Sequence, residues 1–208
     1  MGGLFVTFEG VDGSGKSTQL EMLAAELRRR GQVVLSTREP GGTPLGIRLR
    51  ESLLDINEQV DPLAELLIFA ADRAQHVRTV IQPALAKAKT VLSDRYADAT
   101  VAYQGAGRGF PRETIDQVIA LATGGLKPDL TLFFDLPVEE GLHRISARAA
   151  DGGHSDRIDV ESHAFHQAVR DGYLAIARAE PERFRVIDAM GTAGEIHARV
   201  LKIVSGKQ

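Results

Sequence analysis

FEGVDGSGKSTQ, residues 8–19, is the stretch of sequence that decides the fold. It follows an apolar run and precedes a helical pattern, and residues 10–17 match the phosphate-loop pattern G-x-x-x-x-G-K-[ST]. Glycines let consecutive backbone N–H groups point at phosphate oxygens, and the following helix adds the positive end of its dipole. The alternative is a chance glycine turn, but motif, strand and helix agree here. We therefore predict a nucleoside triphosphate site formed by Gly10, Val11, Asp12, Gly13, Ser14, Gly15, Lys16, Ser17 and Thr18, with Lys16 on the β- and γ-phosphates and Ser17 on Mg²⁺.

Apolar, β-rich segments alternate with helical patterns on both sides of this stretch. Near-continuous hydrophobicity is typical of strands that are covered on both faces. The alternation predicts an α/β fold, a doubly wound five-stranded parallel sheet with right-handed crossovers. The expected strands are 4–9, 32–37, 90–94, 129–135 and 184–189, and the expected helices are 16–30, 44–54, 62–88 in two pieces, 111–123, 138–149, 161–179 and 193–204. Pro83 should begin the second piece of 62–88, and the polar residues 148–157 predict a mobile loop.

Composition limits the class of protein. The 208 residues, 43% of them hydrophobic, suit one domain with one core. A net charge of −3 argues against a nucleic-acid or membrane-surface partner. Residues 28–30, three arginines followed by Gly31, are interpreted as a helix C-terminus, although a nucleic-acid patch is the alternative. With no cysteine, no secretory signal and no membrane-length apolar run, we expect a cytoplasmic location.

A second metal-binding candidate lies at the end of the apolar run TVLSD, residues 90–94. Asp94 would lie beside the phosphate loop, near Mg²⁺ directly or through water. An aspartate at a strand end is also common as a turn or helix cap. The phosphate loop nearby favours the metal role.

Phosphate loops occur in GTP switches, ATPase motors and small-molecule kinases. A switch should carry a guanine-reading N-K-x-D at the exit of a strand. The nearest match, LKPD at 126–129, has the wrong first residue and precedes its strand. A kinase is therefore favoured, and a switch or ATPase, which would hydrolyse the nucleotide without an acceptor, stays the alternative of a different class.

Five motifs resemble those of bacterial thymidylate kinases, over essentially the whole chain. They are FEGVDGSGKST (8–18), TREPGGTPLG (37–46), LLIFAADRAQH (66–76), SDRYADATVAYQGAGRG (93–109) and PDLTLFFDLP (128–137), in the order and spacing of the family. The resemblance implies a single domain over 1–208 with a small lid at about 138–157. It also implies a homodimer and an ATP- and Mg²⁺-dependent phosphorylation of dTMP to dTDP, for dTTP synthesis. Another P-loop nucleotide or nucleoside kinase is the closest alternative.

The resemblance also implies an acceptor site for dTMP. Arg95 would hold the monophosphate with help from Arg50, or from Arg38, and Glu39 would lie near the monophosphate and the metal. Phe69 would stack on thymine, Arg73 would bond a base carbonyl, Thr100 and Gln104 would read the base edge, Tyr103 would close against the sugar, and Asp12 would accept the 3′-hydroxyl. Ala99 stands where the family has serine. Taken alone, Phe69 could be a core residue, the arginines surface ion-pair partners, and residues 104–109 a solvated loop. His163 and His166 are interpreted as exposed helix residues, not metal ligands.

Catalytic positive charge must come from outside the loop, because Val11, Asp12, Gly13 and Ser14 include no arginine. The sequence resembles the family branch whose lid closes over ATP and delivers an arginine. Arg148 is the best match to that residue, and Arg144 and Arg157 would flank the phosphates and adenine. The alternative is three solvated arginines. The expected catalytic set is Lys16, Arg148, Arg95 and Asp12.

Overall fold

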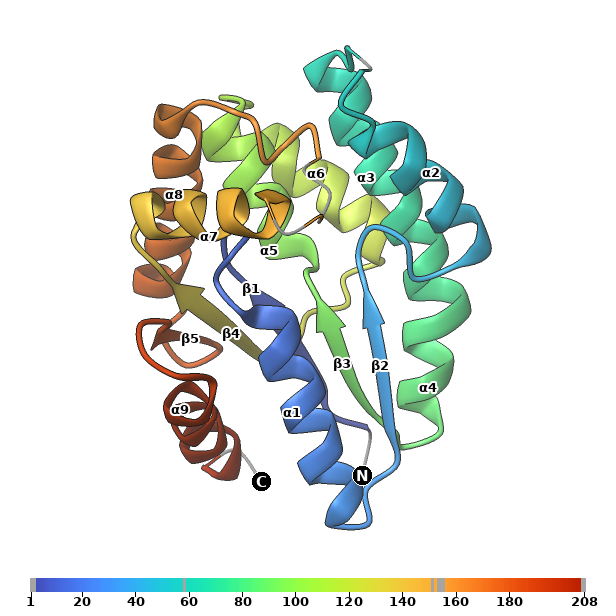
Figure 1. Cartoon of the computed structure of the whole chain (residues 1–208). Coiled ribbons are helices and arrows are strands. Elements are labelled where there is room, and N and C mark those ends of the chain that lie inside the picture. The colour runs from blue at the N-terminus through green and yellow to red at the C-terminus, as the bar shows by residue number, and fades with distance from the viewer. Residues whose placement is uncertain (1–2, 58, 151, 153–155, 207–208) are drawn as a thin grey trace.

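Five parallel strands form one sheet in the order β2-β3-β1-β4-β5 (Figure 1). The computed structural model describes residues 3–57, 59–150, 152 and 156–206. The strands are β1 (Phe5–Glu9), β2 (Val34–Arg38), β3 (Thr90–Asp94), β4 (Leu130–Asp135) and β5 (Phe184–Asp188). The predicted fold class is confirmed, and each strand lies within two residues of its expected bounds.

Helices cover both faces of the sheet. Alternate residues of a strand point to opposite faces. Phe5 of β1 therefore packs with Val77 and Ile81 on one face, whereas Val6 and Phe8 belong to the core cluster that contains the apolar side chains of α1 (Lys16–Arg29). The helix α9 (Ala193–Ser205) lies beside α1 (Figure 1). This two-sided burial explains the near-continuous hydrophobicity of the strands.

The remaining helices lie mostly as the sequence predicts. They are α2 (Pro44–Leu54), α3 (Pro62–His76), η1 (Val77–Ile81), α4 (Gln82–Ala86), α5 (Ala97–Thr100), η2 (Val101–Gly107), α6 (Arg112–Thr123), α7 (Val138–Ala150) and α8 (His163–Ala179). The second piece of 62–88 begins at Gln82, with Pro83 in its first turn, and the π-helical turn η1 joins it to α3 without a break. The three arginines do end α1, before Gly31 at φ 83°.

The helical segment α5–η2 was not expected from the sequence. Its glycines suggested a solvated loop, but the structure uses them for close packing against α8. A Cβ on Gly107 would lie 2.7 Å from the Phe165 ring, and one on Gly172 would lie 2.8 Å from Ala106. The glycines therefore let η2 and α8 approach closely, and Gln104 of η2 is buried, with its amide directed at Glu65 of α3.

The carboxyl ends of the parallel strands meet at one edge of the sheet. The chain leaves β1 toward β2 on one side, and after β3 it crosses to β4 on the other. A crevice beyond the strand ends is expected where connections diverge in this way. No helix in the described part of the chain is both long and apolar enough to cross a membrane.

Candidate active site

The phosphate loop connects β1 to α1, as expected, and is held under α7. Gly10, Gly13 and Gly15 have φ of 149°, 79° and 83°, in the region that favours glycine. A Cβ on Gly13 would lie 2.8 Å from the carbonyl oxygen of Gly141 in α7. The backbone of the loop therefore turns tightly and leaves no room for side chains on its α7 side.

Asp12 joins the two cations expected on the donor and acceptor sides. Its Oδ1 accepts a hydrogen bond from Lys16 Nζ at 2.9 Å, and its Oδ2 accepts one from Arg95 Nη2 at 2.9 Å. Burial raises the pKa of Asp12, but Lys16 and Arg95 more than offset it and hold that pKa well below its usual range. The carboxylate is therefore ionised at neutral pH and positions both cations.

Ser17 and Asp94 lie together at the start of α1 and the end of β3. Ser17 Oγ donates to Asp94 Oδ2 at 2.5 Å. Mg²⁺ prefers oxygen ligands, keeps several waters, and is usually bound by one or two carboxylates together with substrate phosphates. A hydroxyl and one carboxylate beside a phosphate loop fit this donor set. The described residues contain no group of three or more histidine or acidic side chains placed to hold a metal.

Arg95 is held by the turn that follows β3. Its φ is 70°, and its backbone N–H donates to Phe8 of β1. The next N–H, of Tyr96, donates to Glu9 Oε1 at 2.8 Å, and the Tyr173 hydroxyl donates to Glu9 Oε2 at 2.8 Å. Burial, with the nearby Asp98 carboxylate, raises the pKa of Glu9 to about 8. Glu9 was not singled out from the sequence, where it reads as the last residue of a strand.

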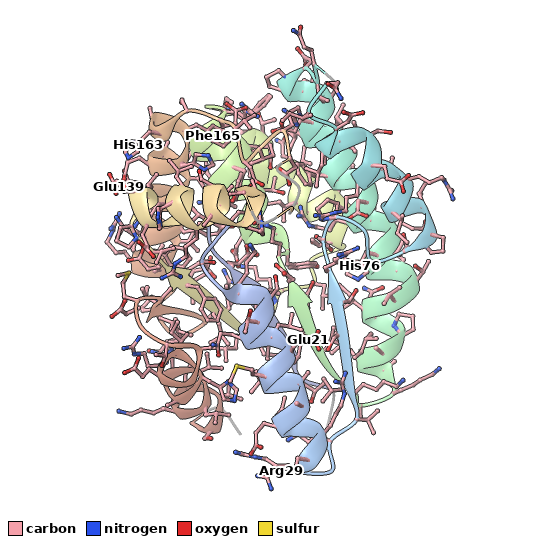
Figure 2. The ribbon with its side chains drawn as sticks, viewed as in Figure 1. Glu21, Arg29, His76, Glu139, His163 and Phe165 are labelled. Atoms are coloured by element: carbon pink, nitrogen blue, oxygen red, sulfur yellow. The ribbon has the colours of Figure 1, made fainter. Side chains whose placement is uncertain are left out.

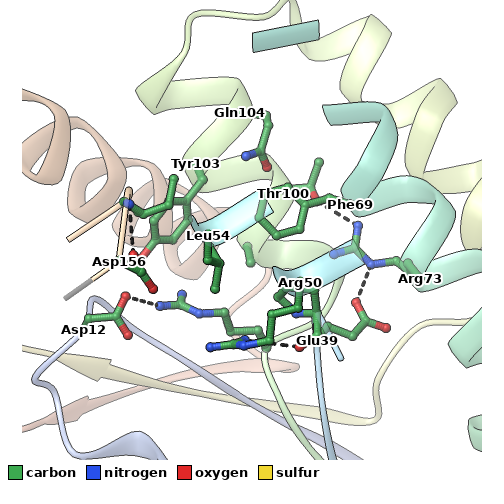
Figure 3. Close-up of a pocket in the computed structure, with 14 residues that line it drawn as sticks. Asp12, Glu39, Arg50, Leu54, Phe69, Arg73, Thr100, Tyr103, Gln104 and Asp156 are labelled. Atoms are coloured by element: carbon green, nitrogen blue, oxygen red, sulfur yellow. Dashed lines mark hydrogen bonds and ion pairs between the residues drawn. The ribbon is translucent and has the colours of Figure 1, made fainter. Parts of the chain in front are cut away.

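All nine residues expected around the acceptor line one pocket. Figure 3 shows most of them, from the phosphate loop, α2, α3 and the α5–η2 segment. The lining comprises the expected Asp12, Glu39, Arg50, Phe69, Arg73, Arg95, Thr100, Tyr103 and Gln104, together with Pro40, Leu54, Ala99, Asp156 and Ile158. The structure therefore brings together residues that are up to 92 positions apart in the chain (12 to 104).

Arg73 is fixed at the pocket wall by three hydrogen bonds. Its Nε donates to Glu39 at 2.7 Å, its Nη1 to Thr100 Oγ1 at 2.7 Å and its Nη2 to the Tyr96 carbonyl at 2.9 Å. The other oxygen of Glu39 pairs with Nδ1 of the buried His76 at 2.9 Å. Thr100 and Glu39 thus orient Arg73, in addition to the substrate contacts expected of them.

The aromatic side chains enclose the pocket on two sides. Phe69 is partly exposed on the pocket-facing side of α3, so it is not a plain core residue. The guanidinium carbon of Arg95 lies 4.9 Å from the centroid of the Tyr103 ring. Tyr103 is 7% exposed, and its buried hydroxyl has no hydrogen-bond partner among the described residues. A polar group of a bound ligand would give this hydroxyl a hydrogen-bond partner.

A second cavity beside the phosphate loop brings many charged side chains together. Its lining includes five basic side chains and five acidic ones, so its formal charge is balanced. The basic residues are Lys16, Arg38, Arg50, Arg95 and Arg148, and the acidic residues are Asp12, Glu39, Asp94, Asp156 and Asp159. Asp12, Glu39, Arg50, Arg95 and Asp156 also line the acceptor pocket, so the two cavities adjoin.

Two of the three lid arginines face the phosphate loop, but Arg157 does not. Arg144 Nη1 donates to the Gly13 carbonyl at 3.3 Å, and Arg148, half exposed, donates to Asp159 at 3.2 Å. Arg157 instead donates to Leu53 and, at 2.6 Å, to Glu65 on the acceptor side. The expected place of Arg157 beside ATP is therefore corrected: a buried carboxylate on α3 holds it. Residues 151 and 153–155 of the expected lid lie outside the described residues.

Glu65 is the main site residue that sequence reasoning missed. It is fully buried, and Gln104, Arg108 and Arg157 all donate to it. The sequence did contain a sign of this role, because Glu65, Phe69 and Arg73 are spaced four residues apart and so share one face of a helix. Two further acidic residues of the site were not predicted: Asp156 lies within the expected lid and accepts from the N–H groups of Ile158 and Asp159, and Asp159, just beyond the lid, accepts from Arg148.

Of the two histidines at 163 and 166, one was misplaced by the sequence prediction. His163 is exposed and pairs with Glu139 of α7 at 2.9 Å (Figure 2). His166 was expected to be exposed, yet it is only 4% exposed. It lines a small space with Gly141 and Ile145, because α7 covers this part of α8.

Comparisons with known proteins agree with this geometry. Residues 8–200 match the family model of thymidylate kinase. The chain is 51% identical over 202 residues to a thymidylate kinase of Desulfosudis oleivorans, covering 95% of this chain and 94% of that one. It is 49% identical over 203 residues to one of Deinococcus radiodurans, covering 98% and 97%. The crystal structure of thymidylate kinase from Ehrlichia chaffeensis superposes with a TM-score of 0.79 at 36% identity, covering 99% and 100%.

Proposed function

The chain belongs to the thymidylate kinase family, and we propose that the γ-phosphoryl group of ATP is transferred to dTMP between its two adjoining cavities. The resemblance inferred from the sequence is thereby confirmed at the level of the family. The enzyme phosphorylates dTMP to dTDP, a step toward dTTP. The observation that carries the assignment of the site is that the acceptor pocket shares Asp12, Arg50 and Arg95 with the cavity beside Lys16.

On the donor side, we assign the ATP phosphates to the loop 10–18. Its backbone N–H groups and the start of α1 stabilise negative charge there. Lys16 would exchange its bond to Asp12 for the β- and γ-phosphates. Ser17 and Asp94 would hold Mg²⁺, which supplies charge neutralisation and orients the triphosphate. Glu39 is a weaker ligand candidate, because both its oxygens are engaged by Arg73 and His76.

On the acceptor side, we assign the monophosphate to Arg95 and Arg50, at the boundary of the two cavities. Arg50 Nη1 donates to the Pro40 carbonyl at 3.1 Å, which keeps its guanidinium in the pocket. Phe69 would stack on the base, Arg73 would donate to a base carbonyl, and Tyr103 would lie against the sugar. Asp12, which lines both cavities, would accept the 3′-hydroxyl.

The transfer itself requires no general base. An oxygen of the acceptor monophosphate, already anionic, forms a bond to the γ-phosphorus. The bond from that phosphorus to the β–γ bridging oxygen breaks, and ADP leaves with the electron pair. Charge spreads over the equatorial oxygens in such transition states, so positioning and cations supply most of the catalysis. Lys16, Arg95 and Arg148 are the cations that we assign to this role.

Three further features belong to the proposal. The chain 1–208 is one domain, in which 138–157 acts as a lid that carries Arg148 toward the phosphates. The enzyme is a homodimer, since Leu63 and Leu67 of α3 are about half exposed and Leu121 of α6 is 79% exposed. Arg78 of η1 donates to the Leu121 carbonyl at 3.5 Å, which links the end of α6 to the helical segment that continues α3. The location is cytoplasmic, where both nucleotide substrates are free.

An ADP-release assay with ATP and Mg²⁺ tests the function, with dTMP, dUMP, dCMP, dGMP or no acceptor. ADP formed with dTMP, weakly with dUMP, and not without acceptor is the expected result. A different preferred monophosphate would leave the phosphate-loop assignment intact and overturn the base-pocket assignment. ADP formed equally without acceptor would overturn the kinase assignment.

A further inference from the structure

Glu65 organises a buried polar cluster behind Gln104, a residue that lines the acceptor pocket. Its carboxylate accepts hydrogen bonds from Gln104 Nε2 at 2.9 Å, from Arg108 Nε and Nη2 at 3.1 and 3.0 Å, and from Arg157 Nη2 at 2.6 Å. Arg108 has a second partner in Glu161, at 2.7 Å. Two carboxylates thus face two guanidinium groups, and Glu65 is the only member that also bonds Gln104.

The charge of Glu65 dictates which end of the Gln104 amide it receives. Burial raises the pKa of Glu65, but hydrogen bonds from Arg108, Gln104 and Arg157 outweigh it and leave that pKa below its ordinary value. An ionised carboxylate only accepts hydrogen bonds, so it must face the NH₂ group of Gln104. The amide oxygen is then left for the pocket, and no described residue donates to it.

The pocket therefore presents a fixed acceptor near a fixed donor. Three of the five N–H groups of Arg73 are bonded to Glu39, Thr100 and Tyr96, and the rest are left for a ligand. Thymine offers an N3–H donor beside its O4 acceptor. Cytosine offers the reverse, an N3 acceptor beside an N4 amino donor.

We propose that Glu65 is a specificity-determining residue, which acts by holding the Gln104 amide so that its oxygen faces N3 of the base. This inference rests on the proposed function, because it assumes that the base of dTMP lies in this pocket. Glu65 does not touch the substrate. To donate to N3 of cytosine, the Gln104 amide would have to rotate, and its oxygen would then face the Glu65 carboxylate without a hydrogen bond. Glu65 therefore selects against cytosine. A polar group left unpaired in a buried site is strongly disfavoured.

The variant Glu65→Gln tests the proposal. A neutral amide can donate or accept, so Gln104 is free to rotate. The ratio of kcat/KM for dTMP to that for dCMP should fall by about tenfold or more. The ratio for dTMP to dUMP should stay unchanged, since thymine and uracil present the same N3–H and O4. A pocket that is merely loosened would shift both ratios.

Two further variants keep the test decisive. Glu161→Gln removes the other partner of Arg108 without touching Gln104, so both ratios should stay at the wild-type values. Glu65→Asp keeps a carboxylate, which only accepts hydrogen bonds, so this variant should retain the discrimination against dCMP even if its melting temperature falls. This second variant provides a test if Glu65→Gln does not fold. Unchanged dCMP discrimination in a folded Glu65→Gln enzyme overturns the inference. A wild-type enzyme inactive on dTMP overturns the proposed function instead.

Discussion

Arg95 Nη2 lies 2.9 Å from Asp12 Oδ2, so the arginine that follows β3 is bonded to the acid inside the phosphate loop. Asp12 also holds Lys16. The cation assigned to the donor phosphates and the cation assigned to the acceptor phosphate are therefore positioned by one carboxylate before either nucleotide arrives. Such preorganisation is the main source of catalysis when the reaction needs charge and alignment rather than proton transfer.

Arg148 should be the largest single contributor from the lid. Arg148→Ala should lower kcat about 10³-fold, because no other guanidinium of α7 lines the cavity beside Lys16. Steady-state kinetics with saturating ATP and dTMP measures this. Arg185→Ala, at a partly exposed site on β5, is the matched control and should leave kcat unchanged. A value for Arg148→Ala within about threefold of the wild type would exclude the role.

Asp94 should govern the requirement for Mg²⁺. Asp94→Asn should raise the Mg²⁺ concentration for half-maximal rate by about tenfold to a hundredfold, because a neutral amide binds the ion or its water more weakly. The measurement is a Mg²⁺ titration of the initial rate. Asp188→Asn changes the equivalent strand-end acid of β5, outside the cavity, and should leave the titration unaltered. Equal curves for both variants and the wild type would contradict the assignment.

Thr100 should act through Arg73. In Thr100→Val the Nη1 group of Arg73 loses its partner at 2.7 Å in a buried site, so kcat/KM for dTMP should fall about tenfold. The KM for ATP should not change, because Thr100 does not line the cavity beside Lys16. Initial rates at varied dTMP and then at varied ATP separate the two effects. A larger effect on ATP than on dTMP would show that this assignment is wrong.

Glu9 should make the protein less stable as pH rises. Burial raises its pKa from 4.5 to about 8, so between these values the folded state binds more protons than the unfolded state. The free energy of unfolding should therefore decrease from about pH 5 to about pH 8, by a few kcal/mol from this residue. Glu9→Gln mimics the protonated form, and urea denaturation across this range should show a flatter profile. Identical slopes for the wild type and Glu9→Gln would rule out this origin.

The exposed apolar face of α3 should form the interface of the homodimer. Leu67→Glu places a charge where Leu67 is now 53% exposed, and burial of that charge in an interface is unfavourable. Light scattering coupled to size exclusion should report a monomer. Val33, directly before β2, is 62% exposed, and the variant Val33→Glu should remain a dimer. A dimer in both variants would place the interface elsewhere.

Local patterns predicted the phosphate loop and the sheet well, because both depend on short-range rules. The glycines within residues 10–17 themselves indicate the backbone geometry of the phosphate loop. The apolar composition of the strands indicates that both of their faces are buried. The acceptor residues were identified through motifs of the family, and the pocket does bring them together. Spacing alone could not tell Phe69 in the pocket from a core phenylalanine.

The parts that were missed depend on contacts between distant segments. Gly107 resembles a loop glycine until Phe165 is known to lie against it. Arg157 resembles a lid arginine, and only the fold shows that Glu65, 92 positions earlier, is its partner. His166 was expected to be exposed because its own helix gives no sign that α7 covers it. In each case the deciding neighbour is far away in the sequence.

The spacing of Glu65, Phe69 and Arg73 along one side of α3 places most of the proposed base contacts and most of the proposed phosphate contacts on different elements. In the proposed function, the base is recognised from α3 and the α5–η2 segment, whereas the phosphates are held by the phosphate loop, the strand ends, α2 and α7. Substitutions that change the preferred base can therefore accumulate on α3 and η2 while the transfer chemistry is preserved. This modularity makes α3 the natural starting point for engineering a kinase of the same fold that accepts a different nucleobase.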